Sequence, residues 1–130
     1  MEPCGRHVLM ELWGCHSRID DPAIVRQAIV EAVAAAGATL LHVHVHRYSP
    51  QGVTGVAVLA ESHFALHSWP ERDYLAADLF TCGDSTDPQA AAAVLQRIFE
   101  PQQMEVQSID RGVMPPSATE AVATEVSTAE

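Results

Sequence analysis

GVTGVAVLAESHFALHSW, which spans residues 52–69, is the stretch that decides the fold. Residues 52–60 are apolar and β-branched, which is typical of a strand, and we expect this strand to be buried on both faces. Residues 63–69 alternate between two kinds of side chain, which predicts a second strand. Because only Glu61 and Ser62 lie between the runs, the lengths allow a tight turn that joins the two strands.

Two helices and four further strands are predicted around this pair. The first helix, over about 21–36, carries apolar residues at helical spacing and ends at Gly37. The second, over about 88–99, has Asp87 as its cap and a proline in its first turn. The other strands are expected at 5–13, 39–47, 74–82 and 104–110. The order β-α-β-β-β-β-α-β predicts an α+β fold, a two-layer α/β sandwich with a mostly antiparallel sheet and two helices on one face.

The length and composition of the chain suit one domain. It has 130 residues, of which 48% are hydrophobic, enough for a modest core. We expect this domain to span residues 1–112, and residues 113–130, rich in Pro, Ser, Thr, Ala and Glu, to be a disordered tail. Neither a membrane span nor a signal peptide is evident, so the expected location is cytoplasmic.

Charge and the choice of basic residue exclude several functions. The formal net charge of −10 argues against nucleic acid or an anionic membrane as a partner, because either would be repelled. All seven basic residues are arginines. Pyridoxal phosphate enzymes hold their cofactor on a lysine, so that chemistry is excluded within this chain, and so is a Walker loop.

His42, His44 and His46 share one face of a predicted strand. Three such positions span about 13 Å at about 3.3 Å per residue, too far for one ion without ligands from elsewhere. Zinc also requires tetrahedral ligands with supporting hydrogen bonds. Hydrogen-bonded histidines on a half-solvated sheet face are therefore the preferred interpretation, and we expect no metal. A metal-binding module remains a third alternative.

Ser62 and His67 invite comparison with a hydrolase dyad. The nucleophile elbow of hydrolases reads G-x-S-x-G, whereas this chain has A-E-S-H-F. Their odd separation also puts the two side chains on opposite faces of a regular strand. A special role for Ser62 therefore requires a turn at Glu61 and Ser62.

The three cysteines form no recognisable framework. Cys4, Cys15 and Cys82 are widely spaced and odd in number, which fits neither a metal pattern nor a set of disulfides. We expect free thiols, either small buried fillers or, for at least one of them, a group used in chemistry.

The motif AESHFALHSWPE at 60–71, followed by DLFTCGD at 78–84, resembles the S-adenosylmethionine decarboxylase proenzymes of prokaryotic type. The resemblance continues in GRHVLMELWGC at 5–15, in HRYSPQGVTGV at 46–56 and in IDRG at 109–112. It covers essentially the whole predicted domain.

Enzymes of this family take no added cofactor. The resemblance implies that the chain cuts itself after the Ser62 hydroxyl attacks the carbonyl of Glu61 and converts the amide to an ester. Elimination then leaves a dehydroalanine, which hydrolyses to a pyruvoyl group at the start of fragment 62–130; the other product is fragment 1–61. The pyruvoyl ketone condenses with the substrate's α-amine and accepts the electrons released as carbon dioxide leaves, the role that pyridoxal phosphate plays elsewhere.

The resemblance also implies catalytic roles for individual residues. Ser62 matches the pyruvoyl precursor, and His67 matches the proton acceptor of processing. Cys82 matches the thiol that returns a proton to the substrate carbon. Thr54 stands where the family often has a serine that supports processing, and it keeps the hydroxyl.

Four further residues match positions that bind substrate. Glu71 resembles the carboxylate that holds the ribose hydroxyls. Tyr48 and Phe64 lie where the family packs residues on the adenine, although an aliphatic residue is common at the position of Phe64; aromatic faces also suit the sulfonium charge. Glu11 is a candidate for the wall of the site.

The resemblance implies decarboxylation of S-adenosylmethionine, which supplies aminopropyl groups for spermidine synthesis, by a homodimer with active sites close to the shared interface. The same pyruvoyl chemistry acting on arginine or ornithine is an alternative, since the mechanism needs only an α-amino acid. A second alternative is an unprocessed regulatory relative that partners an active copy.

Overall fold

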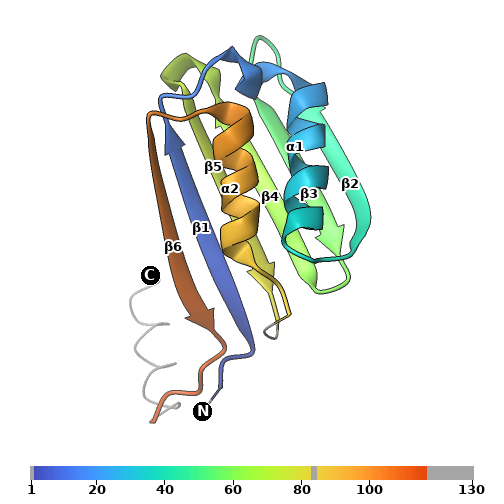
Figure 1. Ribbon diagram of the computed structural model, residues 1–130, viewed down its shortest axis with the longest axis vertical. Coiled ribbons are helices and arrows are strands. Elements are labelled where there is room, and N and C mark those ends of the chain that lie inside the picture. Colours follow the sequence, from blue (N-terminus) through green and yellow to red (C-terminus); the bar gives the residue numbers. More distant parts are fainter. Residues whose placement is uncertain (1, 83–84, 117–130) are drawn as a thin grey trace, which may run out of the picture.

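The computed structural model describes residues 2–82 and 85–116, which form one sheet and two helices (Figure 1). The strands are β1 (Gly5–Trp13), β2 (Leu40–Arg47), β3 (Val53–Leu59), β4 (Ser62–Trp69), β5 (Tyr74–Thr81) and β6 (Gln103–Arg111). The helices are α1 (Pro22–Ala35) and α2 (Pro88–Phe99), and short 3-10 turns lie at η1 (Ser17–Asp20) and η2 (Pro70–Arg72).

The sheet has the strand order β2-β3-β4-β5-β1-β6, and every neighbouring pair is antiparallel. Both helices lie on the same face of it (Figure 1). The predicted α+β sandwich with two helices on one face is therefore confirmed. The strand order was not part of the prediction: β1 inserts between β5 and β6, so the first and last strands pair.

Both helices begin directly after a capping aspartate, which was predicted for α2. The Asp21 carboxylate accepts a hydrogen bond of 2.9 Å from the backbone N–H of Ala23, and Asp87 accepts one of 3.2 Å from that of Ala90. These bonds satisfy amide groups that lack a partner within the helix. The side chains that α1 buries recur at helical spacing, which the sequence pattern indicated; they are Val25, Ala28, Ile29, Ala32 and Val33.

The core lies between the helices and one face of the sheet. Alternate residues of each central strand point into it, for example Phe64 and Leu66 of β4. At Gly55 of β3 a Cβ atom would collide with Cδ1 of Ile29, so the absence of a side chain there leaves room for the end of Ile29 where α1 packs on the sheet.

The prediction that β3 is buried on both faces is wrong. Its residues alternate: Ala57 is fully buried, whereas Val56 and Val58 are 39% and 45% exposed. The physical reason is that α1 and α2 cover only one side of the sheet, so the outward-facing valines have no second layer to pack on. An apolar run therefore does not prove that both faces of a strand are covered within one chain.

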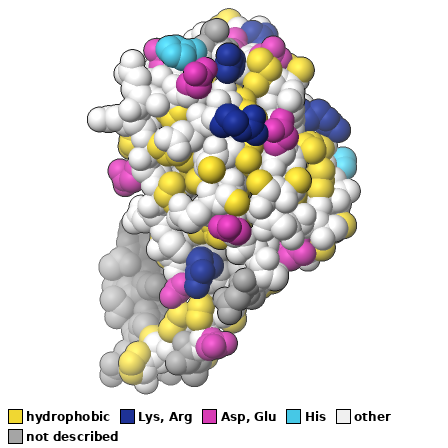
Figure 2. Space-filling model, in the orientation of Figure 1, with side chains coloured by type: hydrophobic (Ala, Val, Ile, Leu, Met, Phe, Trp, Pro, Cys, Tyr) yellow, Lys and Arg dark blue, Asp and Glu magenta, His cyan; other side chains and the backbone are white. Residues whose placement is uncertain are grey.

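We call the side of the sheet away from the helices the open face. It carries large exposed apolar residues, including Trp13, Trp69 and Ile109. Figure 2, drawn from the side of the helices, shows the opposite face of the molecule, where charged and apolar side chains are mixed. Alternation and strand register assign to the open face His7, Leu9, Glu11, Trp13, His42, His44, His46, Thr54, Val56, Val58, His63, Ala65, His67, Trp69, Tyr74, Ala76, Asp78, Phe80, Gln103, Glu105, Gln107 and Ile109.

The structure also bears on the predicted disordered tail and on membrane-spanning segments. Residues 113–116 contain no helix or strand, and residues 117–130 of the predicted disordered tail lie outside the described residues. Neither described helix has the length and apolar character needed to cross a membrane.

Candidate active site

The predicted tight turn between β3 and β4 is present, but it lies one residue earlier than predicted, so Ser62 already belongs to β4. β3 ends at Leu59 and β4 begins at Ser62, so Ala60 and Glu61 make the turn. The backbone N–H of Ala60 donates to the carbonyl oxygen of Thr39 at 2.9 Å, and the Glu61 carboxylate accepts from the Thr39 N–H at 3.0 Å. The two residues before the Ser62 amide are therefore both hydrogen-bonded to Thr39, just before β2.

The thiol of Cys82 lies at this turn. Ser62 pairs with Thr81 across β4 and β5, which brings the next residue, Cys82, beside Glu61. Its Sγ donates a hydrogen bond of 3.1 Å to the carbonyl oxygen of Glu61. Cys82 is an exposed, free thiol. A hydrogen-bond donor thus contacts the oxygen of the Glu61–Ser62 peptide bond, in the position where an attack on that carbonyl would develop negative charge.

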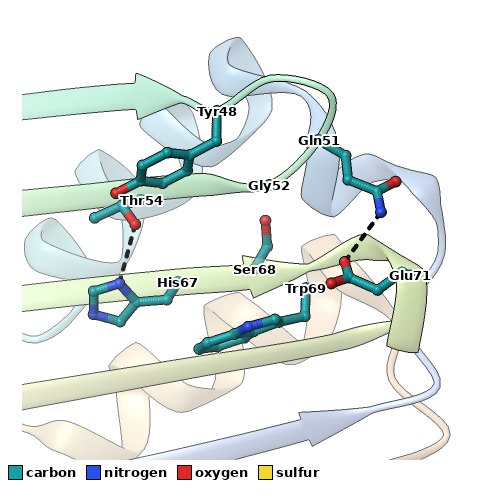
Figure 3. A pocket seen from close by; sticks show the side chains of 8 residues that line it. All are labelled: Tyr48, Gln51, Gly52, Thr54, His67, Ser68, Trp69 and Glu71. Carbon is teal, nitrogen blue, oxygen red and sulfur yellow. Dashed lines mark hydrogen bonds between the residues drawn. The ribbon is translucent and has the colours of Figure 1, made fainter.

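A cavity of about 400 Å³ opens at the other end of β3 and β4 (Figure 3). The rings of Tyr48 and Trp69 flank it, with Thr54 and His67 between them (Figure 3). Its lining residues are Tyr48, Gln51, Gly52, Thr54, His67, Ser68, Trp69 and Glu71.

Two hydrogen bonds order the polar side chains of this cavity. Thr54 and His67 stand opposite each other in the register of β3 and β4, and Thr54 Oγ1 lies 3.1 Å from His67 Nδ1. The Gln51 amide donates to the Glu71 carboxylate at 3.4 Å. Both bonds are drawn in Figure 3. The cavity therefore offers a hydroxyl, an imidazole and a carboxylate between two aromatic rings.

The loop between β2 and β3 is held in place by Asp20 of η1. Its carboxylate accepts a hydrogen bond of 2.9 Å from the Gly52 N–H and another of 3.0 Å from Arg47. These bonds stabilise the charged form, the Gly52 bond more than the Arg47 bond, and so they lower the pKa of Asp20. Asp20 thus fixes the wall of the cavity without lining it.

Glu11 and Tyr74 lie beside the cavity on the open face. The Tyr74 hydroxyl donates to the Glu11 carboxylate. Burial first, and Glu11 second, raise the pKa of Tyr74 to about 12. The Tyr74 ring packs between Trp13 and Trp69, with centroid distances of 5.9 and 5.3 Å. Glu11 does not line the cavity, and its place in the wall of the site stays a prediction.

All the predicted site residues except Glu11 and Phe64 fall into two groups: a junction group of Glu61, Ser62 and Cys82, and a pocket group of Tyr48, Thr54, His67 and Glu71. Along β4, Ser62 and His67 are separated by about 16 Å at about 3.3 Å per residue. The odd separation also turns their side chains to opposite faces of the strand. One protomer therefore assembles each group but does not bring His67 to the Glu61–Ser62 bond.

The prediction that Phe64 stacks on a bound ring is contradicted. Its side chain has 0% exposure and faces the helices, where it belongs to the core. Phe64 has the same parity in β4 as Leu66, whereas the side chain that faces the cavity has the parity of His67. Trp69 shares the parity of His67 and lines the cavity, so the alternation of β4 was the signal that identifies the aromatic residue which sequence reasoning missed.

None of the β2 histidines lines the cavity, although the His46 ring packs edge-on against that of Tyr48, with the ring centroids 4.6 Å apart. His42, His44 and His46 are exposed side by side on β2. Within the described ranges, the residues close enough to share an ion are His7, His63 and Asp78 instead. Burial raises the pKa of the Cys15 thiol to about 11, as expected of a buried filler.

Comparison with known proteins identifies the family of this chain. A family model described as S-adenosylmethionine decarboxylase matches residues 6–112. The chain belongs to this family. The predicted family is therefore confirmed. The prediction that the chain is an enzyme of this family is confirmed with it.

Curated proteins of the S-adenosylmethionine decarboxylase family match most of the chain. An S-adenosylmethionine decarboxylase proenzyme of Thermomicrobium roseum is 50% identical over 115 residues, covering 88% of this chain and 98% of the relative. A proenzyme of the same name from Methanococcus maripaludis is 46% identical over 115 residues, covering 88% and 94%.

Solved structures of the family share the fold. The adenosylmethionine decarboxylase of Aquifex aeolicus superposes with a TM-score of 0.80 at 31% identity, covering 89% of this chain and 97% of that one. A monomer of the Trypanosoma brucei enzyme superposes with a TM-score of 0.59 at 18% identity, covering 92% of this chain and 50% of that one. The second likeness concerns the fold alone.

Proposed function

We propose that this chain is a self-processing decarboxylase of S-adenosylmethionine that derives a pyruvoyl group from Ser62. The observation that carries the proposal is the hydrogen bond from the Cys82 thiol to the carbonyl oxygen of Glu61. This bond lies within the part of the chain that matches the family of decarboxylase proenzymes. The domain spans residues 1–112 and is followed by a tail, residues 113–130. Cleavage divides the whole chain into fragments 1–61 and 62–130.

Cleavage begins when the Ser62 Oγ attacks the carbonyl carbon of Glu61. The C–N bond breaks as the C–O bond forms, the hydroxyl proton passes through a base to the departing nitrogen, and an ester replaces the amide. The Cys82 thiol stabilises the charge that develops on the Glu61 oxygen. We assign the role of base to His67, whose Nδ1 lies 3.1 Å from Thr54 Oγ1.

Elimination completes the cut. A base removes the α-proton of Ser62, the Cβ–O bond breaks, and Glu61 leaves as a carboxylate that ends fragment 1–61. The dehydroalanine left at position 62 tautomerises to an imine, takes up water and loses ammonia, which gives the pyruvoyl group. The ester and the elimination involve only atoms of this chain, so the residues present fit the formation of the group without pyridoxal phosphate or metal.

A pyruvoyl carbonyl at this position supplies an electron sink for the loss of carbon dioxide from an α-amino acid. Cys82 stays beside the start of β4 after the cut. We assign to its S–H group the proton that returns to the substrate carbon. One thiol thereby serves cleavage first and turnover afterwards.

The active enzyme is a homodimer that pairs through the open face. Soluble monomers rarely expose a large contiguous apolar patch, and here Trp13, Val56, Val58 and Trp69 share one face. The twofold axis of this dimer lies between the two open faces and perpendicular to the strands. The strands of the two paired sheets therefore run in opposite directions. The pocket group of one protomer then lies over the junction group of its partner, which joins the two groups that a single chain keeps apart.

The cavity favours S-adenosylmethionine over smaller amino acids. Tyr48 and Trp69 offer two aromatic faces for a purine ring and for the sulfonium charge. Glu71 can accept hydrogen bonds from ribose hydroxyls. Arginine and ornithine have no group that needs these contacts. The product of turnover donates aminopropyl groups to spermidine synthesis, and the location is the cytoplasm.

Carbon dioxide release from S-adenosylmethionine, arginine and ornithine tests the proposal. We expect release from S-adenosylmethionine, and loss of that release in Glu71→Gln. Release only from arginine or ornithine would overturn the choice of substrate. No release from any of the three, with the chain uncut, would favour an unprocessed regulatory relative.

A further inference from the structure

A chain of hydrogen bonds crosses the open face beside the cleavage turn. Asp78 of β5 lies between two histidines: its Oδ2 is 2.8 Å from His7 Nε2 on β1 and 3.2 Å from His63 Nε2 on β4. On the far side, the Arg111 guanidinium of β6 lies 3.1 Å from His7 Nδ1. Four strands thus contribute one side chain each, and none of the four is part of the junction or pocket group.

Arg111 fixes the direction of the hydrogen bonds. A guanidinium only donates, so His7 Nδ1 must accept and His7 Nε2 must carry the proton that it donates to Asp78. A metal ion on His7 Nε2 would instead require the proton on Nδ1, where the arginine stands. The geometry therefore favours a hydrogen-bonded relay over a metal centre, although the three ligand atoms lie within 4.8 Å of one another.

Three of these side chains, those of His7, His63 and Arg111, also pack around Phe80 of β5. The rings of His7 and His63 lie 5.3 and 5.7 Å from the ring of Phe80, and the Arg111 guanidinium lies 5.8 Å from it. Asp78 and His7 are each about one-fifth exposed. The His63 imidazole is consequently restrained on two sides, by the carboxylate of Asp78 and by the face of Phe80.

His63 is the residue that directly follows Ser62. Cleavage removes the covalent bond to Glu61 and turns Ser62 into a chain end, while the amide nitrogen of His63 remains bonded to it. His63 is then the first residue whose side chain is anchored to other strands. We infer that Asp78, oriented by His7 and Arg111, is a positioning residue that holds His63 and thereby aims the new chain end at the substrate.

This inference rests on the proposed function, so the wild-type protein is measured first. Fragment 62–130 with a blocked start and release of carbon dioxide establish the function independently of the relay. The variants Asp78→Asn and His7→Gln are then compared with Asp110→Asn. Asp110 also bridges β1 and β6, through Arg6 at 3.8 Å, but in an exposed ion pair. It is therefore a matched control for the loss of one carboxylate charge.

Turnover is expressed per blocked fragment, counted by mass spectrometry, so that poor folding or slow cleavage does not enter the rate. We expect Asp78→Asn to lower kcat about tenfold with little change in KM, because the substrate still binds but meets a misaligned group. His7→Gln should also lower kcat. The double variant should have a kcat no lower than that of Asp78→Asn alone, since both substitutions act through His63. Asp110→Asn should match the wild type.

Three results would overturn the inference. An unchanged kcat per blocked fragment in both Asp78→Asn and His7→Gln would reduce the cluster to a contributor to stability. A rise in KM with constant kcat would assign it to substrate binding instead. Zinc bound stoichiometrically to purified protein, and lost in Asp78→Asn, would replace the relay by a metal centre.

Discussion

The two faces of the sheet use the same strands for different purposes. Toward the helices, β4 presents Phe64 and Leu66, which are fully buried and make the core. Toward the open face, β4 presents the half-buried His63 and His67 and the exposed Trp69, with the small buried Ala65 between the histidines. A shift of one residue along a strand therefore separates a side chain that stabilises the fold from one that serves the proposed chemistry.

The largest expected effect comes from removing the Ser62 hydroxyl. Ser62→Ala has no nucleophile for the Glu61 carbonyl, so the chain should stay whole and turnover should fall to background. A denaturing gel and an assay of carbon dioxide release check both. Ser108→Ala, on an exposed position of β6, is the control and should be cut normally. A cleaved Ser62→Ala chain would contradict the assignment of the cut.

A mixture of two inactive variants tests whether the open faces pair. Ser62→Ala and His67→Ala should each be inactive alone. Coexpressed, they form hybrid dimers in which an intact Ser62 of one chain meets an intact His67 of the other, and part of the activity should return. The hybrids can be isolated with two different affinity tags. No recovery in purified hybrids would mean that each protomer uses its own His67.

The contrast between the faces also predicts unequal losses of stability. Phe64→Ala leaves a cavity in the core and should lower the free energy of unfolding by about 3–5 kcal/mol. Val58→Ala truncates a side chain that is 45% exposed on the open face, and it should cost less than about 1 kcal/mol. Urea unfolding of both, at matched protein concentration, gives the comparison. Equal losses would show that the two faces are packed alike.

The smallest effect concerns the loop beside the cavity. The folded-state pKa of Asp20 is lowered from its ordinary value of 3.8, chiefly by the Gly52 N–H. Its contribution to stability is therefore present above that value and is lost as the pH falls through the folded-state pKa. Asp20→Asn should be less stable than the wild type at neutral pH, and the gap should narrow below about pH 4. Unfolding curves at several pH values measure it; a constant gap would contradict the shift.

Much of this molecule can be read from local pattern. Asp87 marks the start of the second helix because its carboxylate accepts from an amide of the first turn, and the lengths of the two runs around Glu61 and Ser62 predicted a tight turn, which lies one residue earlier, at Ala60 and Glu61. The resemblance alone put Phe64 at the site, and alternation could not correct it, because it gives the parity of a residue but not which parity meets the helices. The relay of His7, Asp78 and His63 was beyond prediction, because it depends on the insertion of β1 beside β5, far from β4 in sequence.

The central claim is that this chain cuts itself between Glu61 and Ser62, and the intact mass of freshly purified protein under denaturing conditions tests it most directly. The account predicts two masses, those of residues 1–61 and 62–130, with the second fragment blocked at its start and lacking the nitrogen of Ser62. A single mass of the full chain that persists on incubation would contradict it, as would a second fragment that begins with an ordinary serine.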